Sequence, residues 1–120
     1  MKRFDTKKFR QEFSEEEQRE IQKHSDQFER WLRGFLKDKT VQQYILHVDR
    51  NTQWTREYGI YYGHLMLVTN PNQLEAILEQ LQTVPEYQEL TEHFHNANTA
   101  CLNNLIKFRR SCWSPSAENE

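Results

Sequence analysis

The sequence predicts an all-α fold, a single domain of four to five helices. Three points along the chain pair a helix-capping residue with a residue that favours the first turn, and apolar side chains at helical spacing follow each of them. The 120 residues include only three glycines and three prolines. That is too few turn-forming residues for the many short strands of an all-β domain, and the length suits one domain.

The first predicted helix begins after Ser14. Ser14 is a favourable N-cap, and Glu17, three residues later, completes a capping box. The apolar residues that follow are Ile21, Phe28, Trp31, Leu32, Phe35 and Leu36. From Phe28 onward their spacing describes one face of a helix, which we expect to end near residues 37–39.

A second helix is predicted to begin at Thr40, because Thr40 and Gln43 form another capping pair. Its apolar face consists of Val41, Tyr44, Ile45 and Val48. Gly59 is suited to end this helix. The apolar stretch of residues 60–68 is predicted to be a buried connection, since no other segment offers a strand that could pair with it.

Asn70 and Pro71 predict the start of a third helix, because asparagine caps a helix and proline favours its first turn. This helix is expected to end within residues 82–84 and to bury Leu74, Ile77, Leu78 and Leu81. Pro85 opens a short helical segment whose apolar contacts are Tyr87 and Leu90. The last helix is expected to begin within residues 96–98 and to bury Ala97, Cys101, Leu102, Leu105, Ile106 and Phe108.

Charge is unevenly distributed along the chain, although the formal net charge is only −2. Residues 1–13 contain five Lys or Arg and two acids, whereas residues 71–92 contain five Glu and no Lys or Arg. If the fold brings the two basic ends together, the protein has one positive and one negative face. We expect residues 1–13 to form a basic arm, 14–112 the helical domain and 113–120 a polar, disordered tail.

The motifs of common enzyme classes are absent. The glycines form no phosphate loop, and neither a nucleophile elbow nor a Cys-x-x-Cys pair occurs. His47 and Arg50 have the His-x-x-Arg spacing of some DNA strand-transfer enzymes, and His93 and His95 could begin a metal cluster. Neither pair has the further partners that such a site needs. We therefore expect no enzymatic activity, no metal and no cofactor.

The cysteines and the hydropathy predict a cytoplasmic protein. Cys101 and Cys112 are predicted to be reduced thiols, because eleven residues of one helix separate them by about 16 Å, too far for a disulfide. No run of about 18 apolar residues could span a membrane. The basic N-terminus is not followed by the apolar stretch of a secretory signal.

Basic and amide side chains gather on the polar sides of two predicted helices, and such side chains bind phosphates and read base edges. Around the second helix they are Lys37, Lys39, Thr40, Gln42, Gln43 and Arg50. On the last helix they are Asn103, Asn104, Lys107, Arg109 and Arg110. A solvated surface has a similar composition, so these residues alone leave both interpretations open.

Three segments also carry a resemblance to a known family. FERWL occupies residues 28–32, KTVQQYI residues 39–45 and NTACLNNLIKF residues 98–108. In this order and spacing they resemble the core-binding domain of the tyrosine recombinases, the phage-integrase family. That domain typically opens with F-x-x-[WY]-L and K-T-[VI]-x-x-Y helices and ends with S-A-L-x-x-[YF]-x-x-F. The segments TNPNQLEAILEQLQ and PEYQEL fit its third helix and loop, so the resemblance spans about residues 28–110.

The resemblance implies a four-helix, SAM-like bundle that clamps duplex DNA with its second and last helices. Carried over by position, the implied contacts are Lys39, Thr40, Gln43, Asn103, Lys107 and Arg110, and Lys7, Lys8 and Arg10 would form a basic arm. The catalytic domain of that family has no counterpart in these residues. The resemblance therefore implies a non-catalytic DNA-binding module, either an accessory factor or the N-terminal piece of a larger enzyme.

An alternative prediction is a protein-interaction adaptor or inhibitor, such as a phage-type regulator of a DNA-processing enzyme. Its interface would be the acidic surface formed by Glu75, Glu79, Glu86, Glu89 and Glu92. That surface would bind a protein partner or imitate the charge of DNA. Neither function predicts a small-molecule substrate or a membrane partner.

Overall fold

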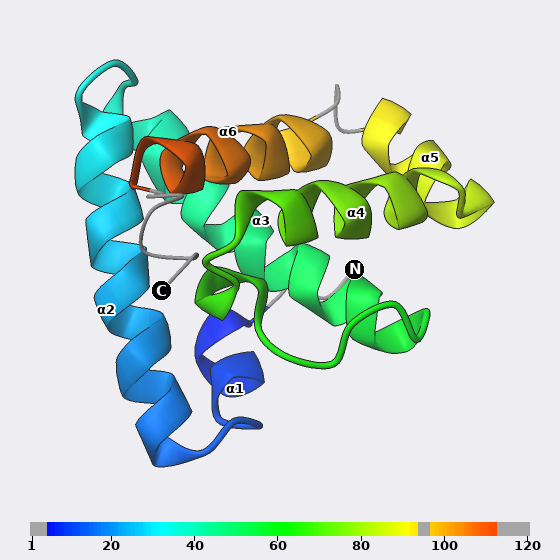
Figure 1. The fold of residues 1–120 in the computed structure, drawn as a ribbon, viewed down its shortest axis with the longest axis horizontal. Coiled ribbons are helices and arrows are strands. Elements are labelled where there is room, and N and C mark those ends of the chain that lie inside the picture. Colours follow the sequence, from blue (N-terminus) through cyan, green and yellow to red (C-terminus); the bar gives the residue numbers. More distant parts are fainter. Residues whose placement is uncertain (1–4, 94–96, 113–120) are drawn as a thin grey trace, which may run out of the picture.

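The fold is built from helices joined by short connections, as a computed structural model of residues 5–93 and 97–112 describes it (Figure 1). The side chains of residues 91–93 are not part of this description. The elements are α1 (Thr6–Arg10), α2 (Glu15–Arg33), α3 (Asp38–Glu57), the 3-10 helix η1 (Leu65–Leu67), α4 (Pro71–Gln82), α5 (Pro85–His93) and α6 (Ala97–Cys112). These described residues contain no strand, so the all-α prediction is confirmed.

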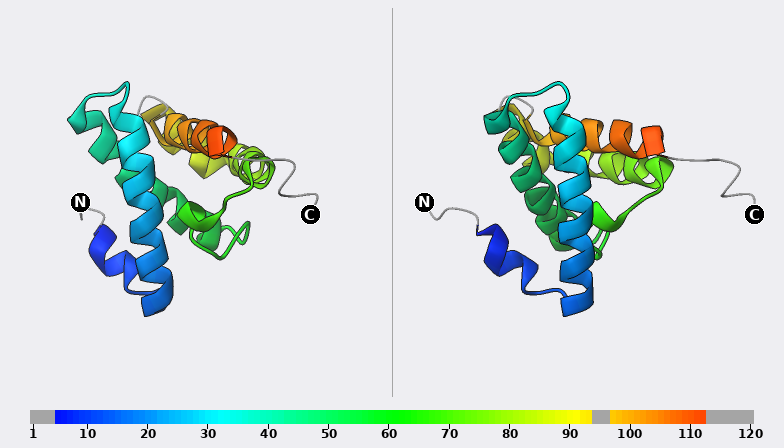
Figure 2. Two further views of the ribbon diagram at one scale, coloured as in Figure 1. Left: turned by 60° about the vertical axis from the view of Figure 1, so that its left-hand side comes forward. Right: turned by 90° about the vertical axis from the view of Figure 1, so that its left-hand side faces the viewer.

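Helix α3 is the centre of the arrangement and contacts α1, α2, η1 and α6. α6 crosses α3 and also packs along α4, which continues into α5. α1 lies at the end of the molecule where α2 begins, whereas α6 lies at the opposite end, near the connection from α2 to α3 (Figures 1 and 2). The described parts of the two basic segments, α1 and α6, therefore lie apart.

The core is drawn from every long helix. Its largest fully buried side chains include Phe28 on α2, Val41 on α3, Leu81 on α4 and Leu105 on α6. Burying side chains of this size contributes about 1.5–3 kcal/mol each. The predicted buried faces of α4 and α6 are confirmed, except that Ala97 is half-buried.

Two of the three helix starts predicted from capping residues are confirmed, and α5 and α6 also begin where expected. The Ser14 hydroxyl accepts the Glu17 N–H at 3.1 Å, and the Glu17 carboxylate accepts the Ser14 N–H at 3.2 Å. At α4, the Asn70 side chain accepts the N–H of Asn72 at 2.9 Å, and Pro71 occupies the first turn. Such caps satisfy backbone donors that the helix itself leaves free.

The predicted boundary between the first two long helices is wrong. α2 ends at Arg33, earlier than expected, and α3 begins at Asp38 rather than Thr40. The N-cap of α3 is Lys37, which makes no side-chain capping bond. The first helical bond runs from the Val41 N–H to the Lys37 carbonyl at 3.0 Å, and Val41 is fully buried. Packing of Val41 thus sets the start of the helix and overrides the capping preference of Thr40.

The end of α3 and the segment that follows agree with the sequence. Gly59 lies just past the helix with a φ of 70°, a conformation that suits glycine. Residues 60–68 form a connection that buries His64, Leu65, Met66 and Val68, so the predicted buried crossing holds for its second half, whereas Tyr62 in the first half is exposed. Cys101 and Cys112 are both free thiols, as predicted.

The N-terminal segment differs from the expected basic arm. Residues 6–10 form α1, and Phe9 and Phe13 pack with Ile21 of α2 in a second, small apolar cluster. The two phenylalanines draw the segment onto the domain, because their apolar surface is removed from water there. Residues 1–4 of the expected arm and the expected tail, residues 113–120, lie outside the described residues. Within the described ranges, no helix combines the length and the apolar character that spanning a bilayer requires.

Candidate functional site

Two of the predicted groups of DNA-binding residues lie on neighbouring helices. The Cys101 thiol donates to the carbonyl oxygen of Tyr44 at 3.1 Å, and the Asn51 amide donates to the carbonyl of Asn98 at 3.3 Å. These contacts fix α6 across α3. Thr40 and Gln43 precede Tyr44 and His47 by one helical turn, so they lie along the side of α3 that faces α6.

We call this surface the α3–α6 face and define it by Lys39, Thr40 and Gln43 of α3 with Asn103 and Lys107 of α6. Thr40 is half-buried and the other four are exposed. α6 contains no Asp or Glu, and α3 contains none from Lys39 to Val48. The nearby carboxylates are Asp38, which precedes Lys39 and pairs with Arg33, and Glu75 and Glu79 of α4, which share a groove with Asn103 and Lys107. Lys39 and Lys107 form no ion pair with any residue that the structure describes.

Arg110, a third predicted contact on α6, is already paired. Its guanidinium donates to the carboxylate of Glu75 on α4, and each side chain is about half exposed. Beside this pair runs a groove of about 580 Å³ between α4 and α6, whose opposite walls carry Glu79 and Lys107. Arg110, predicted to contact DNA, and Glu75, predicted to contact a protein, therefore neutralise each other's charge.

The remaining predicted residues are spread over the rest of the molecule. Lys7 and Lys8 are exposed on α1, at the end of the molecule away from α6. Glu79, Glu86 and Glu89 are exposed on α4 and α5, while the side chain of Glu92 lies outside the described residues. The structure thus places five of the predicted DNA-binding residues on two helices that are in contact, with Asn103 and Lys107 on the side of α6 that faces α4. The other predicted residues lie elsewhere.

Arg10, the last member of the expected arm, belongs to a buried polar network around Asp49 of α3. Its Nε lies 3.2 Å from both carboxylate oxygens of Asp49, and the Thr6 hydroxyl donates to the same carboxylate. The Nε2 atom of His64 lies 2.5 Å from Asp49 Oδ1. The side chains of Asp49 and His64 are both completely shielded from solvent.

The hydrogen bonds of the network fix the protonation of His64. Its Nδ1 accepts the N–H of Met66 at 3.0 Å, so the proton is on Nε2 and is donated to Asp49. Burial lowers the pKa of His64 and outweighs the opposing effect of Asp49. His64 is therefore neutral, and neither ring nitrogen is open to an outside molecule.

Asp49 is the charged member of the network. Burial alone raises the pKa of its carboxyl, but the hydrogen bond from His64, the charge of Arg10 and the hydrogen bond from Thr6 together hold the pKa below its usual range. The carboxylate is thus ionised and neutralised by Arg10. The network ties α1 to α3 and to the segment before η1, which is a structural task.

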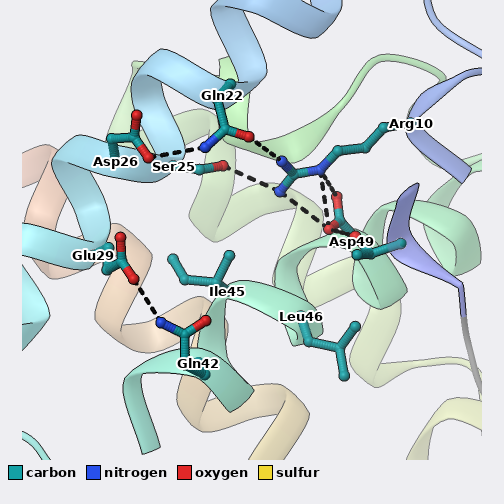
Figure 3. A pocket seen from close by; sticks show the side chains of 10 residues that line it. Arg10, Gln22, Ser25, Asp26, Glu29, Gln42, Ile45, Leu46 and Asp49 are labelled. Carbon is teal, nitrogen blue, oxygen red and sulfur yellow. Dashed lines mark hydrogen bonds and ion pairs between the residues drawn. The ribbon is translucent and has the colours of Figure 1, made fainter. Parts of the chain in front are cut away.

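A cleft of about 340 Å³ lies beside this network, between α1, α2 and α3 (Figure 3). Figure 3 shows the guanidinium of Arg10 reaching Gln22 and Ser25 as well as Asp49, and Gln42 donating to Glu29. The lining holds three carboxylates, those of Asp26, Glu29 and Asp49, against one guanidinium. This excess of negative charge opposes the binding of a phosphate.

Sequence reasoning missed the centre of this network. Asp49 falls on the apolar side of α3, four residues after Ile45, and His64 lies within an apolar run. A polar residue at a core position is the informative signal, because it must be paired when it is buried. Arg109 was also taken for a surface residue. Instead it is buried and donates to the Met66 carbonyl at 2.5 Å.

The described residues contain no group of three His, Cys, Asp or Glu side chains arranged to hold a metal ion. The side chains of His93 and His95 lie outside the described residues. His47, half of the His-x-x-Arg pair, is buried on α3 beside Asn98.

No family model matches this chain, and no curated protein or solved structure is similar enough to it to count as a match. The function is therefore argued from the geometry of the α3–α6 face.

Proposed function

We propose that the protein is a non-catalytic DNA-binding module that holds duplex DNA by its phosphates at the α3–α6 face. One observation carries the proposal: α3 and α6, two helices in contact, both expose lysines and amides, and α6 contains no Asp or Glu. Lys39 and Lys107 supply the charge that phosphates attract. Gln43 and Asn103 supply hydrogen-bonding groups that can position the duplex.

The proposed interface is narrower than the one the sequence suggests. Arg110 is engaged by Glu75, and Arg10 by Asp49, so neither cation is free to meet a phosphate without giving up a partner. Lys7 and Lys8 lie at the far end of the molecule. Two unpaired lysines imply modest affinity and a shallow dependence on salt, with a slope of about 0.9 per phosphate neutralised.

The test is fluorescence anisotropy with a labelled, fully paired duplex at several salt concentrations. We expect the logarithm of the association constant to fall linearly with the logarithm of salt concentration, because counterions are released from the DNA. The variant Lys39→Ala/Lys107→Ala is expected to lose most of the affinity and to flatten the salt slope by roughly two.

The chain offers a matched control in Lys7→Ala/Lys8→Ala. It removes the same two charges from an exposed helix outside the α3–α6 face, so it is expected to keep near-normal affinity. Equal losses in both variants would show that binding follows net charge and not this face. An absence of binding to duplex DNA even at low salt would reject the proposal.

A second candidate function, protein docking, is favoured by the charge of α4 and α5. These helices contain no Lys or Arg, and Glu79, Glu86 and Glu89 are exposed on them. A basic partner would bind here. Titration with an arginine-rich peptide tests this function: the triple variant Glu79→Gln/Glu86→Gln/Glu89→Gln should lose peptide binding and keep its affinity for DNA.

A further inference from the structure

Phe35 is an aromatic side chain that the fold leaves in solvent. It lies in the connection between α2 and α3, and 56% of its surface is exposed. Among the described residues the other large hydrophobic side chain with such exposure is Tyr62, at 69%, in the connection that follows α3. Neither ring contributes to the core, so the exposure of each needs a separate explanation.

The Phe35 ring is held in place from beneath. Its centroid lies 4.9 Å from that of Trp31, with the two planes at 84°, an edge-to-face contact. Trp31 in turn lies 5.7 Å from the ring of Phe108 on α6. This chain of rings connects Phe35 to α6, and Phe35 lies four residues before Lys39 in the chain.

Two positive charges follow the ring in the chain. Lys37 and Lys39 follow Phe35 closely in the chain, both are exposed, and neither forms an ion pair with a described residue. Arg33, on the other side, is already shared by Glu29 and Asp38. An exposed aromatic ring followed by two lysines without an ion-pair partner among the described residues combines a platform for a base with sites for the neighbouring phosphates.

We propose that Phe35 stacks on an unpaired base, so that the protein prefers duplexes with a bulged or gapped nucleotide to fully paired ones. This inference rests on the proposed DNA-binding function and names its substrate class. Charge complementarity favours this occupant: the ring can take the base while Lys37 and Lys39 take its phosphates. A protein partner would need a wider apolar surface than one ring flanked by cations provides.

The experiment compares two duplexes of identical sequence, one fully paired and one with a single bulged 2-aminopurine, whose fluorescence falls when the base stacks. Wild-type protein is expected to bind the bulged duplex about tenfold more tightly and to quench the probe. Phe35→Ala should lose both the preference and the quenching while it keeps wild-type affinity for the paired duplex. Phe35→Trp should retain both, and Phe35→Leu should lose the quenching.

Tyr62→Ala is the matched control, because it removes the other exposed ring, which lies beyond the opposite end of α3. It should leave the preference and the quenching unchanged. Wild-type protein that binds both duplexes equally, with the salt dependence described above, would overturn the stacking and leave the proposed function standing. Binding to neither duplex would overturn both. Loss of self-association in Phe35→Ala, measured by sedimentation, would assign the ring to a second copy of the chain instead.

Discussion

The polar network beneath α1 and the α3–α6 face use similar side chains in opposite ways. Around Asp49, the charge is matched inside the fold by Arg10, and His64 is held neutral. On the α3–α6 face, Lys39 and Lys107 have no charged partner in the described chain. A buried charge must be paired to be tolerated, whereas an exposed one can remain unpaired and available to a ligand. Burial, and not residue type, therefore distinguishes charged side chains that stabilise the fold from those that are available to a ligand.

Asp49→Ala is expected to have the largest effect on this comparison. The change leaves Arg10, His64 and Thr6 without their common acceptor in a buried site. Breaking a buried ion pair by removing one partner costs about 3–5 kcal/mol. Urea denaturation followed by circular dichroism should show a loss of this size in the free energy of unfolding.

Asp26→Ala is the control for this change, because Asp26 is an exposed carboxylate on the neighbouring α2. Its loss should alter the free energy of unfolding by no more than about 0.5 kcal/mol. If the two variants unfold at the same urea concentration, the network around Asp49 does not stabilise the fold.

Most of the fold could be predicted from the sequence, because capping residues and apolar spacing within single helices specify it. The capping box at Ser14, the Asn70–Pro71 start and Gly59 all act within one or two turns. The start of α3 could not be predicted, since it depends on the burial of Val41 in the folded core. The pairing of Asp49 with Arg10 was not readable either. Those two residues lie 39 positions apart and meet only after α1 has packed.

The α3–α6 face was predictable in part for the same reason. Gln43 and Lys107 are placed by the periodicity of their own helices, which the sequence shows. The pairing of Arg110 with Glu75 depends on how α4 lies against α6, and no local pattern encodes that. The sequence could therefore name candidate cations but could not say which of them the fold would neutralise.

The second expected effect concerns pH and arises from His64. The pKa of the folded-state imidazole is lowered from its ordinary value of 6.5, chiefly by burial. Below pH 6.5, His64 is therefore protonated in the unfolded chain but neutral in the folded chain. The free energy of unfolding falls as the pH falls, until the pH reaches the pKa of the folded state. The slope of the free energy of unfolding against pH can reach about 1.4 kcal/mol per unit for this group.

His64→Gln removes this titration and can still donate to Asp49, so its stability should fall less between pH 7.5 and pH 5.5. Some slope should remain, because burial also lowers the pKa of His24 and of His47. Denaturation curves at several pH values measure both slopes. Identical slopes in the wild type and the variant would mean that His64 does not contribute to acid sensitivity.

The smallest expected effect arises from Lys37, where stability and the proposed binding make opposite demands. Lys37 is the N-cap of α3 but makes no capping bond, and asparagine there could accept a backbone N–H of the first turn. Lys37→Asn should therefore raise the free energy of unfolding by about 0.5–1 kcal/mol. It should also weaken DNA binding and reduce the salt slope by about 0.9, because one phosphate contact is lost.

Thr40→Ala, in contrast, should alter stability by less than about 0.5 kcal/mol, because Thr40 is not the cap. Gained stability with undiminished DNA affinity in Lys37→Asn would place the phosphates elsewhere. Opposite changes, a gain in stability with a loss of DNA affinity, would show that Lys37 contributes a cation for binding at a position where another residue would cap the helix better.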